Sequence, residues 1–522
     1  MFGPTYSVTK ITCIVAICGF IMGMDVTSSS VFLGKDHFIE YFNHPSPIYQ
    51  GLLTAASPLG GLCGCLLFNC IAGKLGRVDL FRTGLVLWVK GSFIGVFSLN
   101  LWLVILSRWV KGLTVGLFSI LIAAYVAEVI PKHKKGRTMA LVQLAFSMAM
   151  LSIYYLCVLL DSLGSPLSFR VVWGLEMTPA MAVLVLTLWL PESPEWLTLH
   201  GDYIRAEEIQ NRLAAHYNRS SNGTKISLYS KLELACIYGS RADGFGYLDL
   251  FRRNCWRQTL MGSTLQLLIQ FSGINIVMYY IIFLCDMIGL QGTVRLVSAS
   301  MPYLINVPLN ILPILISDHV KRKDLTLAGA FPLSIIMLIL GTTMACNGKR
   351  VPPINGNKSL IWAIDQSVGS LVLGLSFLFV AVFTITLSSG PWIYTNELLP
   401  TKAKHRGLAL CMLVGWTANF SLTLLGPVML ATISWGTFIL LGTATFTISM
   451  AILLFFPDTK DLTPEEIDHL YDKASQDVAE SSSCKEELEN KTSESQCAVQ
   501  PESGSEAIKM VNEDKVASSA ND

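Results

Sequence analysis

The sequence predicts an all-α membrane protein with twelve transmembrane helices in two six-helix pseudo-repeats. Composition is the first observation: of 522 residues, 52% are hydrophobic and only 14% are charged, and the mean hydropathy is +0.52. Soluble proteins carry about 25% charged residues, so most of this chain needs an apolar environment. The second observation is a series of apolar runs of about 20 residues, long enough to cross a ~30 Å hydrocarbon core. The third is an internal repeat.

The repeat consists of a tyrosine, a glutamate, a proline and an arginine with the same spacing in both halves of the chain. Its two copies are Tyr125, Glu128, Pro131 and Arg137, and Tyr394, Glu397, Pro400 and Arg406. Each copy lies where an apolar run meets a loop rich in lysine and arginine. Duplicated membrane halves are the mark of secondary transporters.

The apolar runs place the twelve expected spans at about residues 10–33, 50–72, 80–99, 102–129, 138–161, 171–190, 258–284, 294–316, 326–345, 366–392, 407–430 and 433–456. They form an N-terminal half, 1–190, and a C-terminal half, 258–456. Between the halves, 191–257 reads as a cytoplasmic insert with a charged helical segment. The tail, 457–522, is expected to be largely disordered after about residue 474, because its Ser/Glu/Lys-rich composition cannot bury enough apolar surface.

Basic residues cluster in alternate loops, after the second, fourth, eighth and tenth spans. The positive-inside bias therefore places these loops and both termini in the cytoplasm. On this topology Asn357 is the Asn-x-Ser/Thr site that faces outside and is open to glycosylation. A net charge of +1 suggests no nucleic-acid partner. The 13 scattered cysteines have neither metal-site nor disulfide spacing, so no metal is expected.

Short motifs along the membrane part resemble those of the sugar porter family of the major facilitator superfamily. They are GFIMGMD at 19–25, GKLGR at 73–77, the stretch 108–136, PESPEWL at 191–197, QLLIQFSGIN at 266–275 with Tyr279 and Tyr280, the stretch 391–406, and PDTK at 457–460. The resemblance implies the major facilitator fold. It also implies a secondary transporter that moves a sugar across the membrane by alternating access.

Three amides of the seventh span, Gln266, Gln270 and Asn275, are candidate binding groups. Each offers donors and acceptors without a charge to desolvate, which suits a neutral polyhydroxy ligand. The alternative is hydrogen bonding between helices, which amides also provide in membranes. The family resemblance adds further candidate substrate-binding residues, namely Gln143, Asn306, Phe383, Trp392 and Asn419.

The chain departs from the family pattern at Ile269, where a second glutamine is usual, at Gly415, where many members carry an asparagine, and at Ser388–Ser389, which replaces a Gly-Pro step. Fewer amides at the site put glucose itself in question. A different hexose, a pentose, a polyol and a disaccharide stay open.

Asp25 and Arg108 are charges inside the first and fourth spans. Such residues normally pair or titrate, because a charge at the bilayer centre costs at least ~2.5–3.5 kcal/mol. In proton-coupled family members the corresponding acid lies near the corresponding arginine. Symport with H+ is therefore the expected mode, and proton-independent facilitated uniport is the alternative.

Six charged residues at the expected cytoplasmic helix ends form a candidate gate. They are Arg77, Glu128 and Arg137 in the first half and Arg322, Glu397 and Arg406 in the second. Salt bridges between helices would hold this gate shut and would open easily, since surface ion pairs contribute only ~0–1 kcal/mol.

The sequence contains no catalytic constellation and no phosphate-cradling loop, so neither an enzyme nor a cofactor is expected. The predicted partners are a small-molecule sugar and the lipid bilayer, with no oligomeric state indicated. The plasma membrane is the default location and a vacuolar membrane the alternative. A sugar sensor that signals without transport is the competing function of another class.

Overall fold

A computed structural model describes residues 4–33, 36–43, 45–160, 167–220, 250–251, 255–316, 320–354, 360–399 and 404–459. The chain divides into two compact units, Met1–Asp468 and His469–Asp522, and the second unit lies outside the described residues. The expected disordered tail and the expected glycosylation site Asn357 also lie outside them.

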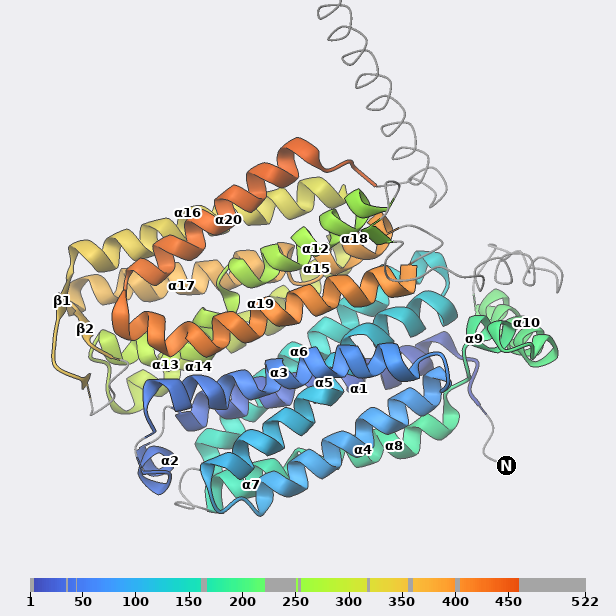
Figure 1. The fold of residues 1–522 in the computed structure, drawn as a ribbon, viewed down its shortest axis with the longest axis horizontal. Coiled ribbons are helices and arrows are strands. Elements are labelled where there is room, and N and C mark those ends of the chain that lie inside the picture. Colours follow the sequence, from blue (N-terminus) through green and yellow to red (C-terminus); the bar gives the residue numbers. More distant parts are fainter. Residues whose placement is uncertain are drawn as a thin grey trace, which may run out of the picture. The chain divides into compact units, whose positions relative to one another are not determined.

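The first half contains α1 (Val8–Leu33), α2 (Asp36–Tyr41), α3 (Pro47–Ile71), α4 (Arg77–Val96), α5 (Leu101–Val129), α6 (Lys132–Leu160), α7 (Leu167–Leu175), α8 (Met177–Leu186) and the 3-10 turn η2 (Thr187–Trp189). Two further helices, α9 (Pro194–Leu199) and α10 (Tyr203–Ser220), follow it. They lie at one end of the helices, here called the α10 end, on the right in Figure 1.

The second half contains α12 (Trp256–Phe271), α13 (Ile274–Met287), α14 (Gly292–Leu309), α15 (Ile311–Ile316), α16 (Arg322–Cys346), α17 (Gln366–Thr386), α18 (Gly390–Leu398), α19 (Lys404–Thr432) and α20 (Gly436–Phe455). Two short antiparallel strands, β1 (Gly348–Arg350) and β2 (Trp362–Ile364), pair with Lys349 opposite Ala363. They mark the opposite end, here called the hairpin end (Figure 1).

Eleven helical spans of the described residues are long and apolar enough to cross a membrane. The one expected span that is not among these eleven, 80–99, corresponds to α4, which has 20 residues but carries Arg77, Asp79, Arg82 and Lys90. Because α4 packs against α5, α7 and α8, protein covers much of its surface. The structure therefore has the twelve spans that the sequence predicts.

Four of the spans predicted as continuous are interrupted within their length. The breaks fall at Glu176 between α7 and α8, at Ser272–Gly273 between α12 and α13, at Asn310 between α14 and α15, and at 387–389 between α17 and α18. At the second break Gly273 adopts a φ of +92°, which residues with a side chain rarely adopt. Broken helices are tolerated at membrane depth where protein or a cavity surrounds them.

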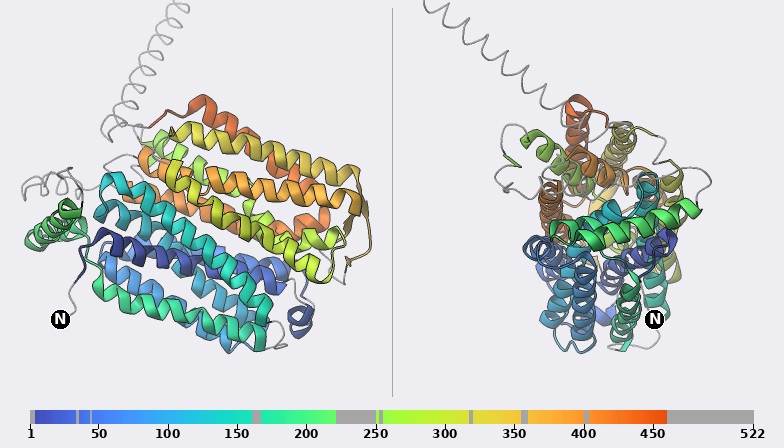
Figure 2. Two further views of the ribbon diagram at one scale, coloured as in Figure 1. Left: turned by 180° about the vertical axis from the view of Figure 1, so that it is seen from behind. Right: turned by 90° about the vertical axis from the view of Figure 1, so that its right-hand side faces the viewer.

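The packing of the helices repeats between the halves. In the first half α1 packs on α6, α3 on α5 and α4 on α8; in the second, the equivalent pairs are α12 with α19, α14 with α17 and α16 with α20. The halves meet through α3 with α19 and through α6 with α14, which are again equivalent pairs. The end-on view in Figure 2 shows the two groups of helices one above the other.

Large apolar side chains remain exposed along the outer faces of the spans. Examples are Phe93 of α4, Leu159 of α6, Leu315 of α15, Leu371 of α17 and Phe455 of α20. Contiguous apolar surface of this kind is unfavourable in water, whereas hydrocarbon accommodates it. The bilayer is thus the environment of the bundle.

Gly116 on α5 is expected to tolerate no side chain. A Cβ atom there would collide with the carbonyl oxygen of Gly61 on α3. Overpacking costs about 1–3 kcal/mol or more, so Gly116→Ala should lower the apparent melting temperature of the purified protein. Gly73→Ala is the matched control, because nothing lies within 4 Å of a Cβ at Gly73. Equal melting temperatures for the two variants would contradict the close α3–α5 contact.

Candidate functional site

A cavity of about 240 Å³ lies between the two halves. Helices α1, α3, α5 and α6 of the first half and α12, α13, α14, α17, α18 and α19 of the second contribute to its wall. All eight predicted substrate-binding residues line it: Gln143, Gln266, Gln270, Asn275, Asn306, Phe383, Trp392 and Asn419. The structure thus brings together residues that are nearly 280 positions apart in the sequence.

The three amides of α12 and α13 are held by hydrogen bonds. Asn275 donates its Nδ2 to Oε1 of Gln270 at 2.6 Å, across the helix break, and Gln266 donates its Nε2 to Oγ1 of Thr395 at 3.1 Å. A carboxamide has two donor hydrogens and two acceptor lone pairs, so each one retains hydrogen-bonding capacity for a ligand. Preformed partners fix the orientation of the remaining donors and acceptors.

Asn306 of α14 joins the wall to two further elements. Its Oδ1 accepts hydrogen bonds from Nδ2 of Asn310 at 2.7 Å and from Oγ1 of Thr384 at 2.9 Å. Asn310 also donates to Oγ of Ser147 on α6 at 2.7 Å. This chain of polar contacts crosses from one half to the other beside the cavity.

The sequence analysis did not assign Trp416 to the site, yet it lines the cavity and donates its Nε1 to Oγ of Ser119 on α5 at 3.2 Å. With Phe383 and Trp392, it supplies aromatic surface suited to the apolar face of a ring. Its polar indole nitrogen, three residues before Asn419 in the same span, is the sequence signal that could have identified it.

Each departure from the family pattern also falls on the cavity wall. Ile269, Ser388, Ser389 and Gly415 all line it. A Cβ at Gly415 would approach the Cβ of Gln266 to 3.2 Å, so a side chain there would occupy space next to that amide. The departures therefore change the shape and polarity of the cavity itself.

Asp25 and Arg108 meet behind this wall, as the sequence predicts, with Nη2 of Arg108 3.3 Å from Oδ2 of Asp25. The sequence analysis missed two further members of the cluster. Nζ of Lys111 lies 2.7 Å from Oδ1 of Asp25 and 2.9 Å from Oε2 of Glu176, and its ammonium group faces the ring of Trp88 at 5.6 Å. Ionisable residues inside apolar spans are functional candidates by default, and that signal could have found both.

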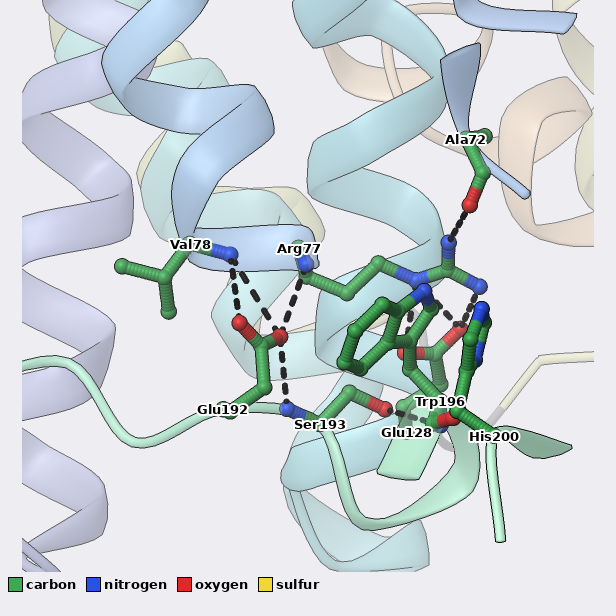
Figure 3. A network of polar contacts seen from close by, with 8 residues as sticks. All are labelled: Ala72, Arg77, Val78, Glu128, Glu192, Ser193, Trp196 and His200. Carbon is green, nitrogen blue, oxygen red and sulfur yellow. Dashed lines mark hydrogen bonds and ion pairs between the residues drawn. The ribbon is translucent and has the colours of Figure 1, made fainter. Parts of the chain in front are cut away.

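At the α10 end, Arg77 begins α4 and forms a bidentate ion pair with Glu128 of α5. Its Nη2 and Nε lie 3.1 Å from Oε1 and Oε2 of the carboxylate, respectively (Figure 3). Glu192 accepts hydrogen bonds from the backbone nitrogens of Arg77 at 2.7 Å and Ser193 at 2.9 Å. A carboxylate at a helix N-terminus satisfies otherwise unpaired N–H groups and interacts favourably with the helix dipole.

Burial raises the pKa of Glu192 above its ordinary value, although the backbone N–H donors around the carboxylate oppose the shift. The residue belongs to the predicted 191–197 motif, but the sequence analysis did not place it in the gate. Trp196 of the same motif stacks on His200 with ring centroids 4.0 Å apart (Figure 3). His200 also contacts the carbonyl oxygen of Gly73 at 2.9 Å. These contacts fasten α9 to the loop before α4.

The second half repeats the arrangement. Nε of Arg322 on α16 lies 3.2 Å from Oε1 of Glu397 on α18, and Thr459 donates to the same carboxylate at 2.9 Å. The tyrosine repeated in the two halves has a structural counterpart as well: Tyr125 donates to the carbonyl oxygen of Pro191, and Tyr394 to that of Pro457.

Both gate ion pairs join helices of one half, rather than crossing from one half to the other. The remaining two predicted gate residues, Arg137 and Arg406, are exposed at the α10 end. The sequence led us to expect bridges across a gate, and the structure places Arg77–Glu128 and Arg322–Glu397 as braces within the halves.

Besides the Asn310–Ser147 and Trp416–Ser119 contacts beside the cavity, further hydrogen bonds join the halves toward the hairpin end. Ser30 of α1 donates to the carbonyl oxygen of Tyr279 on α13 at 2.8 Å, and Tyr154 of α6 donates to that of Leu296 on α14 at 2.7 Å. The cavity lining extends from Tyr279 toward Met139 and Met412, on the α10 side. The halves therefore contact each other on the hairpin side of the cavity.

Residues 11–471 match the family model described as "Sugar (and other) transporter". Over 470 residues the chain is 40% identical to the probable metabolite transport protein YFL040W of Saccharomyces cerevisiae, with 90% of this chain and 87% of that protein covered. Over 474 residues it is 28% identical to the high-affinity glucose transporter of Kluyveromyces lactis, with 90% and 86% covered.

Solved structures show the same fold. The proton:xylose symporter XylE bound to 6-bromo-6-deoxy-D-glucose matches with a TM-score of 0.74 at 21% identity, over 89% of this chain and 98% of that one. The inward open conformation of the xylose transporter XylE from E. coli matches with a TM-score of 0.67 at 22% identity, over 89% and 100%. The architecture is that of the major facilitator superfamily.

Proposed function

Because the chain belongs to the sugar (and other) transporter family, we propose that it carries a sugar across a membrane by alternating access. The observation that carries the proposal is that six amide side chains from five helices, and aromatic side chains that include Phe383, Trp392 and Trp416, converge on one cavity between two equivalent halves. The relation to a protein named as a high-affinity glucose transporter supports a sugar as the solute. The proposed activity is transport and not catalysis.

The eight cavity residues predicted from the sequence are the proposed binding residues. The amides exchange hydrogen bonds with the hydroxyl groups of the solute, while Phe383 and Trp392 cover its apolar face. A volume of about 240 Å³ lies just below the ~300–1,000 Å³ typical of pockets for drug-sized ligands. This size favours a monosaccharide or polyol over a disaccharide.

The contacts between the halves support a cavity that opens alternately to the hairpin end and to the α10 end. Rocking would break the hydrogen bonds of Ser30 and Tyr154 at the hairpin end and close the α10 end instead. The Arg77–Glu128 and Arg322–Glu397 pairs keep the helix ends of each half together during this movement. Rigid-body rocking of repeats around a fixed site is the general mechanism of such carriers.

The proposed topology places the α10 end in the cytoplasm. Helices α4, α6, α16 and α19 all begin at that end (Figure 1), and the basic loops precede or open these helices. The positive-inside bias supports this orientation, with both termini cytoplasmic. The insert 191–257 would then be a cytoplasmic latch between the halves, and the plasma membrane the proposed location.

Cells without other sugar carriers are expected to take up a labelled sugar when they express this chain. The panel is D-glucose, D-mannose, D-xylose, D-sorbitol and maltose, and the measurement is initial uptake relative to cells with an empty vector. A monosaccharide or polyol should be transported faster than maltose. Binding of a sugar without movement of any member of the panel would instead support the sensor function.

A further inference from the structure

We infer that the positive charge of Lys111 replaces the charge of a transported proton, and that sugar flux through this chain therefore runs without proton coupling. The inference rests on the proposed function and concerns the driving force at the same cavity. It favours facilitated uniport over symport, the two modes that the sequence leaves open.

The geometry behind it is the position of the Lys111 ammonium group between two carboxylates. Its distances to Asp25 and Glu176 are 2.7 and 2.9 Å, and Arg108 contacts the second oxygen of Asp25 at 3.3 Å. The four side chains have exposed fractions of only 0–2%. Two acids therefore face two bases, and the cluster is neutral with no proton bound.

Charge balance decides whether such a cluster binds a proton. Protonation of Asp25 or Glu176 would leave one positive charge in excess, and an uncompensated buried ion costs several kcal/mol. Without Lys111, one negative charge would be in excess, and one proton would restore neutrality. Lys111 thereby converts a site that would titrate into a permanent network of ion pairs.

Other groups in the described part of the chain do not alter this balance. The groups that face the cluster from the packed helices are uncharged at neutral pH: Ser28 of α1, Ser57 and the carbonyl oxygen of Thr54 on α3, Trp88 of α4, and Tyr279 and Tyr280 of α13. Lys111 also lies three positions after Arg108, on a neighbouring part of the same helix. One helix thus supplies both positive charges.

The test uses the full-length protein in lightly buffered proteoliposomes. The probe is the fastest-exchanging member of a panel of radiolabelled D-glucose, D-xylose, D-sorbitol and maltose. Wild-type protein is expected to equilibrate this sugar without accumulation, at a rate that a protonophore and an imposed pH gradient leave unchanged. Sugar addition should produce no alkalinisation of the outer medium. Accumulation that the protonophore abolishes, or alkalinisation on sugar addition, would overturn the inference.

The variants separate a charge effect from a structural one. Lys111→Met should make exchange pH-dependent, with a rate that rises up to about tenfold for each unit fall in pH on the alkaline side of the new titration. The double variant Lys111→Met/Glu176→Gln removes one base and one acid, so it should again be insensitive to pH. Lys111→Arg keeps the charge and should also be insensitive.

Two further outcomes count against the inference. If the Lys111→Met variant exchanges sugar at a rate that is as independent of pH as that of the wild type, the lysine does not take the place of a proton. If Lys111→Met does not fold, the wild-type accumulation and alkalinisation assays decide alone. Failure of every panel sugar to exchange, even without a gradient, would instead overturn the proposed function and the inference together.

Discussion

Gln270→Ala is expected to reduce sugar uptake by about tenfold to a hundredfold at low sugar concentration. The substitution removes hydrogen bonds to the solute and also removes the acceptor that Asn275 contacts at 2.6 Å. Loss of the partner of a shielded polar group costs about 1–3 kcal/mol, and each 1.4 kcal/mol corresponds to a factor of ten. The loss should appear mainly as a higher KM, measured from initial uptake rates over a range of sugar concentrations.

Thr417→Ala provides the control for this measurement. Thr417 is an exposed polar residue on α19, near the cavity residues in sequence but outside the cavity lining, and its hydroxyl bonds only its own helix in the described contacts. Uptake by this variant should equal that of the wild type at equal surface expression. An unchanged KM for Gln270→Ala would show that the amide serves helix packing, which was the alternative explanation for amides in this span.

The spans themselves could be predicted from the sequence because a bilayer imposes one simple requirement, a long apolar run. The breaks at Ser272–Gly273 and at Asn310 could not be predicted from that requirement. They depend on partners far along the chain: Asn310, for example, contacts Ser147 of the other half. α4 gave a weaker signal for a related reason, since protein and not lipid covers its polar positions.

The candidate site could be predicted as far as residue type reveals function. An amide such as Gln270 is rare enough in an apolar run to be informative, and Asp25 and Arg108 stand out as charges. The partners of a side chain depend on the fold, so the sequence did not reveal that Lys111 lies between Asp25 and Glu176. For the same reason the sequence drew attention to the charged helix ends, but it did not reveal that Arg77 with Glu128, and Arg322 with Glu397, pair within one half.

Glu128→Gln is expected to lower the stability of the protein more than the equivalent change in the second half. Glu128 and Arg77 have exposed side-chain fractions of 1% and 6%, whereas Glu397 and Arg322 have 32% and 13%. Removal of one partner from a buried ion pair costs about 3–5 kcal/mol, because the other charge is left uncompensated. In the Glu397→Gln variant, water can solvate the Arg322 guanidinium group, so this variant should lose less stability than Glu128→Gln.

Asp79→Asn completes this series as the surface control. Asp79 pairs with Arg82 at 2.7 Å, but the two side chains are 54% and 40% exposed, and such pairs contribute only ~0–1 kcal/mol. The apparent melting temperature in detergent should therefore be lowest for Glu128→Gln and intermediate for Glu397→Gln. That of Asp79→Asn should be close to the wild-type value. An equal fall for the two glutamate variants would contradict the prediction, because it would show that the difference in burial between the two ion pairs has no energetic consequence.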